Sequence, residues 1–130
     1  MTAETDERTI LVVDDEEVTT ELAKSLFTRH GFRVLVASDG EEALEVAESE
    51  RPDLILLDVM LPKLDGFEVC RRLRSQDAFE KTPILMFTAR GLTRDIERGK
   101  ESGADEYIVK PFQGRDLVAT IKKHLGLQSE

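Results

Sequence analysis

The chain has 130 residues, the length of one ordinary domain, and its 40% hydrophobic content excludes a disordered protein. A formal net charge of −9 argues against direct binding to nucleic acid or to an anionic membrane surface. The amino terminus lacks the features of a secretory signal, and no apolar run approaches the roughly 20 residues of a membrane span. Because Cys70 is the only cysteine, an intrachain disulfide is impossible, and we expect a reduced, cytoplasmic protein.

Short apolar segments rich in β-branched residues alternate along the chain with segments of helical spacing. The predicted strands are Ile10–Val13, Val34–Ala37, Leu54–Leu57, Ile84–Phe87 and Tyr107–Val109. The first, third and fourth are continuous apolar runs, which is typical of strands buried on both faces of a parallel sheet.

The segments between and after these strands predict five helices, each with one apolar face. The residues expected on these faces are Leu22, Leu26 and Phe27; Ala43, Leu44 and Ala47; Phe67, Cys70 and Leu73; Leu92 and Ile96; and Leu117, Val118, Ile121 and Leu125. Gly31 suits the position after the first helix. Ser38 with Glu41, and Asp65 with Glu68, have the spacing of capping boxes.

Strand and helix alternate five times with short connections, which predicts a doubly wound α/β fold with a five-stranded parallel sheet and five helices. We expect one domain, residues 9–125, between short polar tails at residues 1–8 and 126–130. Such sheets bind ligands at the carboxyl ends of their strands, near the point where the strand order reverses. For the order 2-1-3-4-5, that point lies between the first and third strands.

Polar residues stand at the ends of four predicted strands. Asp14 and Asp15 end the first strand, Asp58 the third, Thr88 the fourth and Lys110 the fifth. Each has an ordinary explanation when taken alone: an acid after a strand often caps the next helix, and a lysine or threonine is common at a surface. Their convergence at one edge of the sheet is what indicates a site.

Three neighbouring carboxylates repel one another unless a cation lies between them. An open site of oxygen ligands, without histidine or cysteine, favours Mg²⁺. A divalent cation beside an aspartate, a lysine and a hydroxyl suits phosphoryl transfer to a carboxylate, because the cation and Lys110 would neutralise the phosphoryl oxygens while Asp58 acts as the nucleophile.

Four motifs resemble the receiver domain of two-component response regulators. They are Asp14-Asp15, Asp58 with Met60-Leu-Pro-Lys-Leu-Asp-Gly66 behind it, Thr88-Ala89, and Lys110-Pro111-Phe112. The resemblance covers nearly the whole chain, residues 9–125, and is closest to stand-alone receivers of the chemotaxis-regulator type. It implies a flavodoxin-like fold, in agreement with the sheet predicted above.

The resemblance also implies roles for residues of the acidic cluster. Asp58 would be the phosphoacceptor. Asp15 would bind Mg²⁺ directly, together with the Asp58 carboxylate and the backbone carbonyl of Met60, and Asp14 would bind largely through water. Catalysis would be confined to the domain's own phosphorylation and dephosphorylation.

Further implied roles concern the switch and the partners. Lys110 would contact the phosphoryl group, and its bond to Pro111 would be cis; Thr88 would be the switch hydroxyl and Tyr107 the aromatic residue that follows it. A histidine kinase or histidine phosphotransfer protein would be the donor, and a downstream protein would bind the face formed by the fourth helix, fifth strand and fifth helix. Thr120 replaces an arginine that supports dimerisation of many receivers, so we expect a monomer.

Two other functions remain open on the sequence. The first is a metal-dependent phosphatase with an aspartyl nucleophile, in which Glu16 after Asp14 would be the acid or base. The second is a receiver-like interaction module that takes no phosphate. The chain itself could be a stand-alone receiver or a fragment of a larger regulator.

Overall fold

The computed structural model describes residues 7–89 and 91–127. Its strands are Thr9–Val13 (β1), Arg33–Ala37 (β2), Leu54–Leu57 (β3), Ile84–Thr88 (β4) and Glu106–Val109 (β5). Its helices are Glu17–Arg29 (α1), Gly40–Glu50 (α2), Gly66–Arg74 (α3), Thr93–Ser102 (α4) and Gly114–His124 (α5), with a 3₁₀ turn at Asp77–Phe79 (η2). All the predicted strands and helices are therefore present, with strand boundaries within one residue of those expected. The predicted polar tails fall largely outside the described residues.

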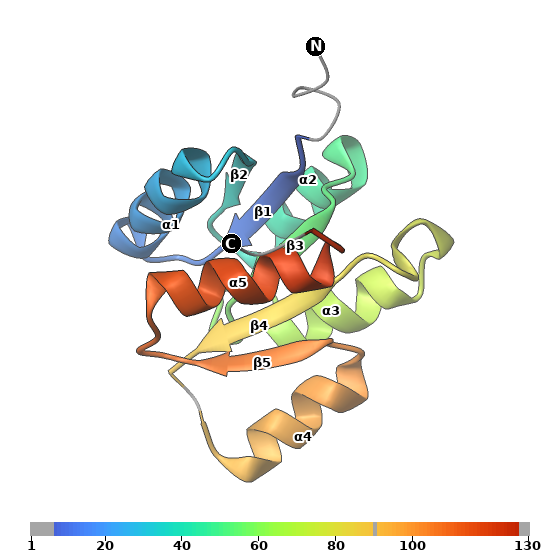
Figure 1. The fold of residues 1–130 in the computed structure, drawn as a ribbon. Helices are drawn as coiled ribbons and strands as arrows, with labels where there is room; N and C mark the ends of the chain where they lie inside the picture. Colours follow the sequence, from blue (N-terminus) through green and yellow to red (C-terminus); the bar gives the residue numbers. More distant parts are fainter. Residues whose placement is uncertain (1–6, 90, 128–130) are drawn as a thin grey trace.

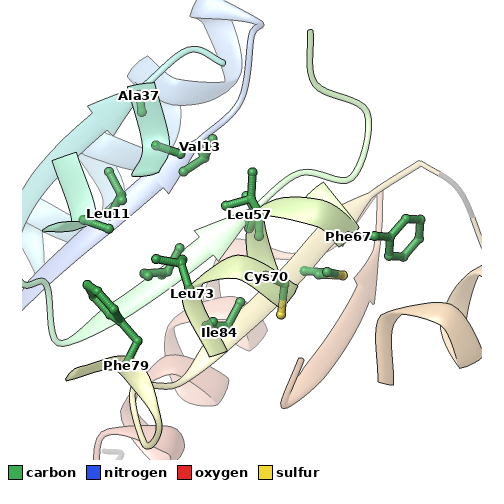
Figure 2. Packing of buried hydrophobic residues seen from close by; sticks show 14 of the residues in the cluster. Leu11, Val13, Ala37, Leu57, Phe67, Cys70, Leu73, Phe79 and Ile84 are labelled. Carbon is green, nitrogen blue, oxygen red and sulfur yellow. The ribbon is translucent and has the colours of Figure 1, made fainter. Parts of the chain in front are cut away.

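The strands form one parallel sheet in the predicted order β2-β1-β3-β4-β5, with helices on both faces (Figure 1). Helices α1 and α5 cover one face, where Phe27 and Ile121 pack on the strands. Helices α2 and α3 cover the other face, where the cluster includes Leu57, Cys70 and Leu73 (Figure 2). Burial of β1, β3 and β4 on both faces explains why their sequences are continuously apolar.

Three of the local expectations are wrong. Leu92 is the N-cap residue of α4 and is 56% exposed, so it does not belong to a buried face of that helix. The second helix is capped by Asp39, whose carboxylate accepts from the Glu42 backbone N–H at 2.8 Å, so the box lies one residue beyond the predicted Ser38–Glu41 pair. Leu22 is 68% exposed, because the stripe of α1 that faces the sheet passes through Ala23 and Phe27.

Three other local expectations are confirmed. Asp65 accepts from the Glu68 backbone N–H at 2.9 Å at the start of α3. Gly31 follows α1 with a φ of 89°, in the region that favours glycine. The peptide bond between Lys110 and Pro111 is cis.

Strand register brings the ends of β1 and β3 together. Val13 pairs with Leu57, so the residues that follow them, Asp14 and Asp58, leave the sheet side by side. The Asp58 N–H donates to the Val13 carbonyl at 3.0 Å, which extends the pairing to the end of the strands. The parallel sheet therefore delivers both carboxylates to its carboxyl edge, as the rule for doubly wound folds predicts.

Candidate functional site

The three aspartates lie together at the carboxyl edge of the sheet. Each of Asp14, Asp15 and Asp58 offers a carboxylate oxygen, and these oxygens lie within 4.8 Å of one another. Asp14 and Asp58 are only 1% and 6% exposed, whereas Asp15 faces solvent. Two buried carboxylates and an accessible third, all with hard oxygen donors, fit a divalent cation such as Mg²⁺ that keeps part of its water shell.

Lys110 directly follows β5 and reaches the acidic cluster. Its ammonium lies 2.9 Å from an Asp14 oxygen and 3.4 Å from an Asp58 oxygen, and it sits 4.7 Å from the centre of the Phe87 ring. Burial alone would lower the pKa of Lys110, but the hydrogen bond to Asp14 and the charge of Asp58 outweigh burial and raise it. Lys110 is thus a fixed cation that compensates two buried anions.

The Asp58 carboxylate is held by groups from three segments. One oxygen accepts from the Met60 backbone N–H at 3.1 Å, and the other faces Lys110. Burial raises the pKa of Asp58 and the neighbouring charge of Asp14 adds to this, while the Met60 N–H, Lys110 and the Thr88 hydroxyl act in the opposite direction. Asp58 is therefore a fixed carboxylate whose negative charge is only partly compensated by its protein neighbours.

The predicted site residues divide into two groups. Asp14, Asp15, Asp58 and Lys110 meet at one place, with Thr88 fully buried at the end of β4 beside them. Tyr107 belongs to β5 and packs with the hydrophobic cluster on the face of α2 and α3.

The ring of Phe87 beneath Lys110 was not predicted as part of the site. Phe87 is one of several apolar residues in a continuous strand, so no signal in the sequence distinguishes it.

The Met60 side chain, two residues after Asp58, is 55% exposed. Arg90, which the sequence places two residues after Thr88, lies outside the described residues.

The fold and the site together match one protein family. Residues 10–122 match the family model of the response regulator receiver domain, and the chain belongs to this family. It is thus a receiver domain of the two-component type rather than a conventional enzyme.

The relatives include transcriptional regulators. The chain is 55% identical over 113 residues to the alkaline phosphatase synthesis transcriptional regulatory protein PhoP of Bacillus subtilis, covering 87% of this chain and 46% of that protein. It is 52% identical over 113 residues to the transcriptional regulatory protein AfsQ1 of Streptomyces coelicolor, covering 87% and 48%. The chain therefore spans about half the length of the curated relatives it matches.

Solved structures of response regulators have the same fold as this chain. A response regulator from Chloroflexus aurantiacus superposes with a TM-score of 0.88 at 36% identity, covering 93% of this chain and 99% of that one. The chemotaxis response regulator CheY4 of Vibrio cholerae superposes with a TM-score of 0.86 at 34% identity, covering 91% and 98%. Among the described residues, none of the helices is long and apolar enough to cross a membrane.

Proposed function

We propose that Asp58 takes a phosphoryl group from the phosphohistidine of a histidine kinase or histidine phosphotransfer protein. The observation that carries this proposal is the position of Lys110, which reaches both Asp14 and Asp58 at the carboxyl edge of the sheet. In the transfer, an Asp58 oxygen forms a bond to phosphorus as the bond from phosphorus to the histidine nitrogen breaks, and the nitrogen keeps the electron pair. Lys110 then faces the added negative charge.

Asp14, Asp15, Asp58 and the Met60 backbone carbonyl would hold Mg²⁺ in this function. When bound, the ion supplies positive charge that offsets the phosphoryl oxygens and the crowded carboxylates. The protein's own part is to keep Asp58 ionised and in place, through the Met60 N–H and Lys110. The same groups would support the slow loss of phosphate that returns the domain to its starting state.

The signal would leave the site through the neighbouring face of α4, β5 and α5. We propose that the phosphoryl oxygens draw in the Thr88 hydroxyl, that Tyr107 follows, and that this face then binds a downstream protein. Residues 9–125 would form the working unit, as a cytoplasmic monomer without direct contact to nucleic acid, in keeping with the net charge of −9. The relatives named as transcriptional regulators support an output that controls transcription in a longer protein.

The phosphatase alternative is not favoured. Glu16, its proposed acid or base, is the N-cap residue of α1, is exposed, and accepts a hydrogen bond from the Thr19 hydroxyl at 3.1 Å. The second alternative, an interaction module that takes no phosphate, is not favoured either, because such a module would not need buried carboxylates. Asp14, Asp58 and Lys110 are all present and in contact.

The test is phosphoryl labelling with Mg²⁺ and a small acyl-phosphate donor such as acetyl phosphate. We expect one equivalent of label on the wild-type protein, none on Asp58→Asn, and none on the wild type in EDTA. Asp53→Asn, which changes an aspartate away from the carboxyl edge, should label normally. Labelling of Asp58→Asn at the wild-type level would refute the assignment, and turnover of a phosphate ester would favour the phosphatase.

A further inference from the structure

The chain's single tyrosine lies against a glycine of α4. A Cβ placed on Gly99 would come within 2.8 Å of Cδ2 and 3.2 Å of Cε2 of the Tyr107 ring, and within 3.3 Å of the Met86 sulfur. Real Cβ atoms essentially never approach another heavy atom within 3.0 Å, so the ring and a side chain at position 99 exclude each other. Glycine weakens a helix interior, and its presence here is explained by the space that the ring needs.

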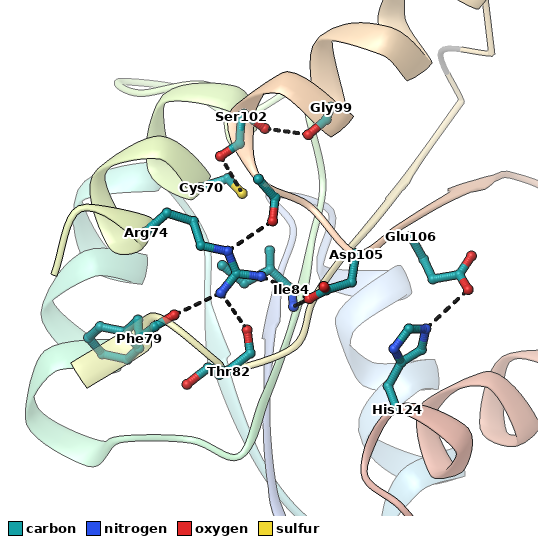
Figure 3. Close-up of polar contacts among 11 residues, drawn as sticks. Cys70, Arg74, Phe79, Thr82, Ile84, Gly99, Ser102, Asp105, Glu106 and His124 are labelled. Carbon is teal, nitrogen blue, oxygen red and sulfur yellow. Dashed lines mark hydrogen bonds and ion pairs between the residues drawn. The ribbon is translucent and has the colours of Figure 1, made fainter. Parts of the chain in front are cut away.

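The turn of α4 that contains Gly99 is tied to α3 (Figure 3). The Ser102 hydroxyl donates to the Gly99 carbonyl at 2.7 Å, and the buried Cys70 thiol donates to the Ser102 carbonyl at 3.3 Å. Burial raises the pKa of the Cys70 thiol, which keeps it protonated as a donor. Arg74 donates from Nε to the Gly103 carbonyl at 2.9 Å. The backbone at the end of α4 is therefore held in place.

Arg74 is itself anchored at several points. Its Nη1 donates to the carbonyls of Phe79 and Thr82, both at 2.7 Å, and its Nη2 lies 2.8 Å from Asp105. The same Asp105 oxygen accepts from the Ile84 N–H at 2.9 Å, at the start of β4. One guanidinium thus joins α3, the end of α4 and the segments that lead into β4 and β5. We call these contacts of Arg74 the Arg74 clasp.

Space is available beside the ring. A hollow of about 180 Å³ lies between α4 and β5, lined by Ile96, Lys100, Ala104, Asp105, Glu106 and Tyr107. The ring is the far end of a rotatable side chain, whereas the end of α4 is fixed by the Arg74 clasp and the Cys70 contact. A side chain added at position 99 should therefore displace the ring and leave the helix in place.

We propose that Gly99, held by the anchored end of α4, is a seat that fixes the position of the Tyr107 ring. Gly99 is then a positioning residue of the switch. This role in switching rests on the proposed function, whereas the packing of the Tyr107 ring against Gly99 is independent of it. Tyr107 is the aromatic residue that follows Thr88 in the proposed switch, so the seat sets where that ring lies relative to α4.

The first test uses the intrinsic fluorescence of the protein, which comes from Tyr107 because the chain has one tyrosine and no tryptophan. We expect Gly99→Ala to raise the acrylamide quenching constant about twofold, since the half-buried ring loses its contact with α4 and becomes more accessible to the quencher. Glu101→Ala, an exposed change on the same helix, should leave the constant unchanged. An unchanged or lower constant in Gly99→Ala would overturn the proposal.

The second test is a double-mutant cycle followed by circular dichroism in urea. In a Tyr107→Ala background, Gly99→Ala should raise the denaturation midpoint, because alanine favours the helix and no ring opposes it. With Tyr107 present, the same change should raise the midpoint less or lower it. Equal shifts in both backgrounds would refute the seat. Both tests are made without Mg²⁺ or phosphoryl donor, so their outcome is independent of whether Asp58 is labelled.

Discussion

The charge of Asp58 opposes folding in the absence of a cation. Burial and the nearby Asp14 raise its pKa, so the folded protein binds this proton more readily than the unfolded chain does. The contribution of such a group to the free energy of unfolding is most favourable at acid pH, and it is lost as the pH rises through the pKa of the folded state. At neutral pH the ionised carboxylate therefore lowers the free energy of unfolding, and a bound cation would remove this effect.

We predict that Asp58→Asn stabilises the protein in EDTA at neutral pH. The amide oxygen can still accept from the Met60 N–H, and Lys110 keeps Asp14 as its partner. The gain should appear as a higher midpoint of urea denaturation, in the direction that the raised pKa of Asp58 requires. It should shrink as the pH falls into the range where the wild-type Asp58 is protonated. Glu45→Gln, an exposed change, is the control; a gain that is independent of pH would contradict the explanation.

A second prediction at the residue scale concerns the lifetime of the phosphoryl group. Hydrolysis needs a water molecule held in line with phosphorus, and the exposed thioether of Met60 near Asp58 cannot orient water. We expect Met60→Asn to speed the decay of phosphorylated protein several-fold, because an amide can hold that water. Met60→Leu should decay like the wild type. Decay rates can be followed by loss of label after removal of the donor, and equal rates for Met60→Asn and wild type would exclude a role for Met60.

Helix α3 carries Arg74, which joins it to the end of α4 and to the segments that lead into β4 and β5. Arg74→Ala would leave the carbonyls of Phe79, Thr82 and Gly103 without this donor and Asp105 without its cation. We predict a loss of about 3 kcal/mol in the free energy of unfolding, since several charge-assisted bonds are lost together.

The matched control for this prediction is Arg72→Ala. Arg72 is exposed on the same helix and pairs with Glu68 four residues earlier. Such surface pairs contribute at most about 0.5 kcal/mol. Urea denaturation of both variants decides the point, and similar losses for Arg72→Ala and Arg74→Ala would show that the clasp has no special role.

The elements themselves could be predicted from the sequence more fully than the contacts between them. Continuous apolar runs such as Leu54–Leu57 define buried strands because no polar residue interrupts them. The contacts of Arg74 were not predicted, because three of its acceptors are backbone carbonyls, which carry no signal in residue type. Leu22 was misplaced for a related reason: apolar spacing gives the direction of a helix face only to within about one residue.

The convergence of the three aspartates could be predicted because it follows from topology. Once the order 2-1-3-4-5 is inferred, the ends of β1 and β3 must be neighbours, and Asp14, Asp15 and Asp58 follow directly. The closer contact of Lys110 with Asp14 than with Asp58 depends on side-chain conformation in the folded protein. The seat of Tyr107 on Gly99 likewise depends on a distance between α4 and β5 that the sequence does not encode locally.

At the scale of the whole molecule, we predict that activation leaves the protein monomeric. Helix α5 has Thr120 at the position where many receivers place an arginine for dimerisation, and its basic residues come later, at Lys122 and Lys123. Lys123 lies 3.8 Å from Glu106 of β5 within the same chain. Light scattering with Mg²⁺ and beryllofluoride, a phosphoryl mimic, should show an unchanged mass. A shift to twice the monomer mass would overturn the prediction.

The ion pair between Lys110 and Asp14 determines when, during synthesis and folding, the site becomes complete. It joins residues that are 96 positions apart, so it forms only after the chain has been made through β5 and the sheet has closed around β1. During synthesis, β1 is made before the strands that pair with it. A partly formed sheet can therefore contain Asp14 and Asp58 while Lys110 is still missing. A kinase that needs the complete site would therefore mark only molecules in which this domain has been made through Lys110 and has folded, and the phosphoryl group would report that folding.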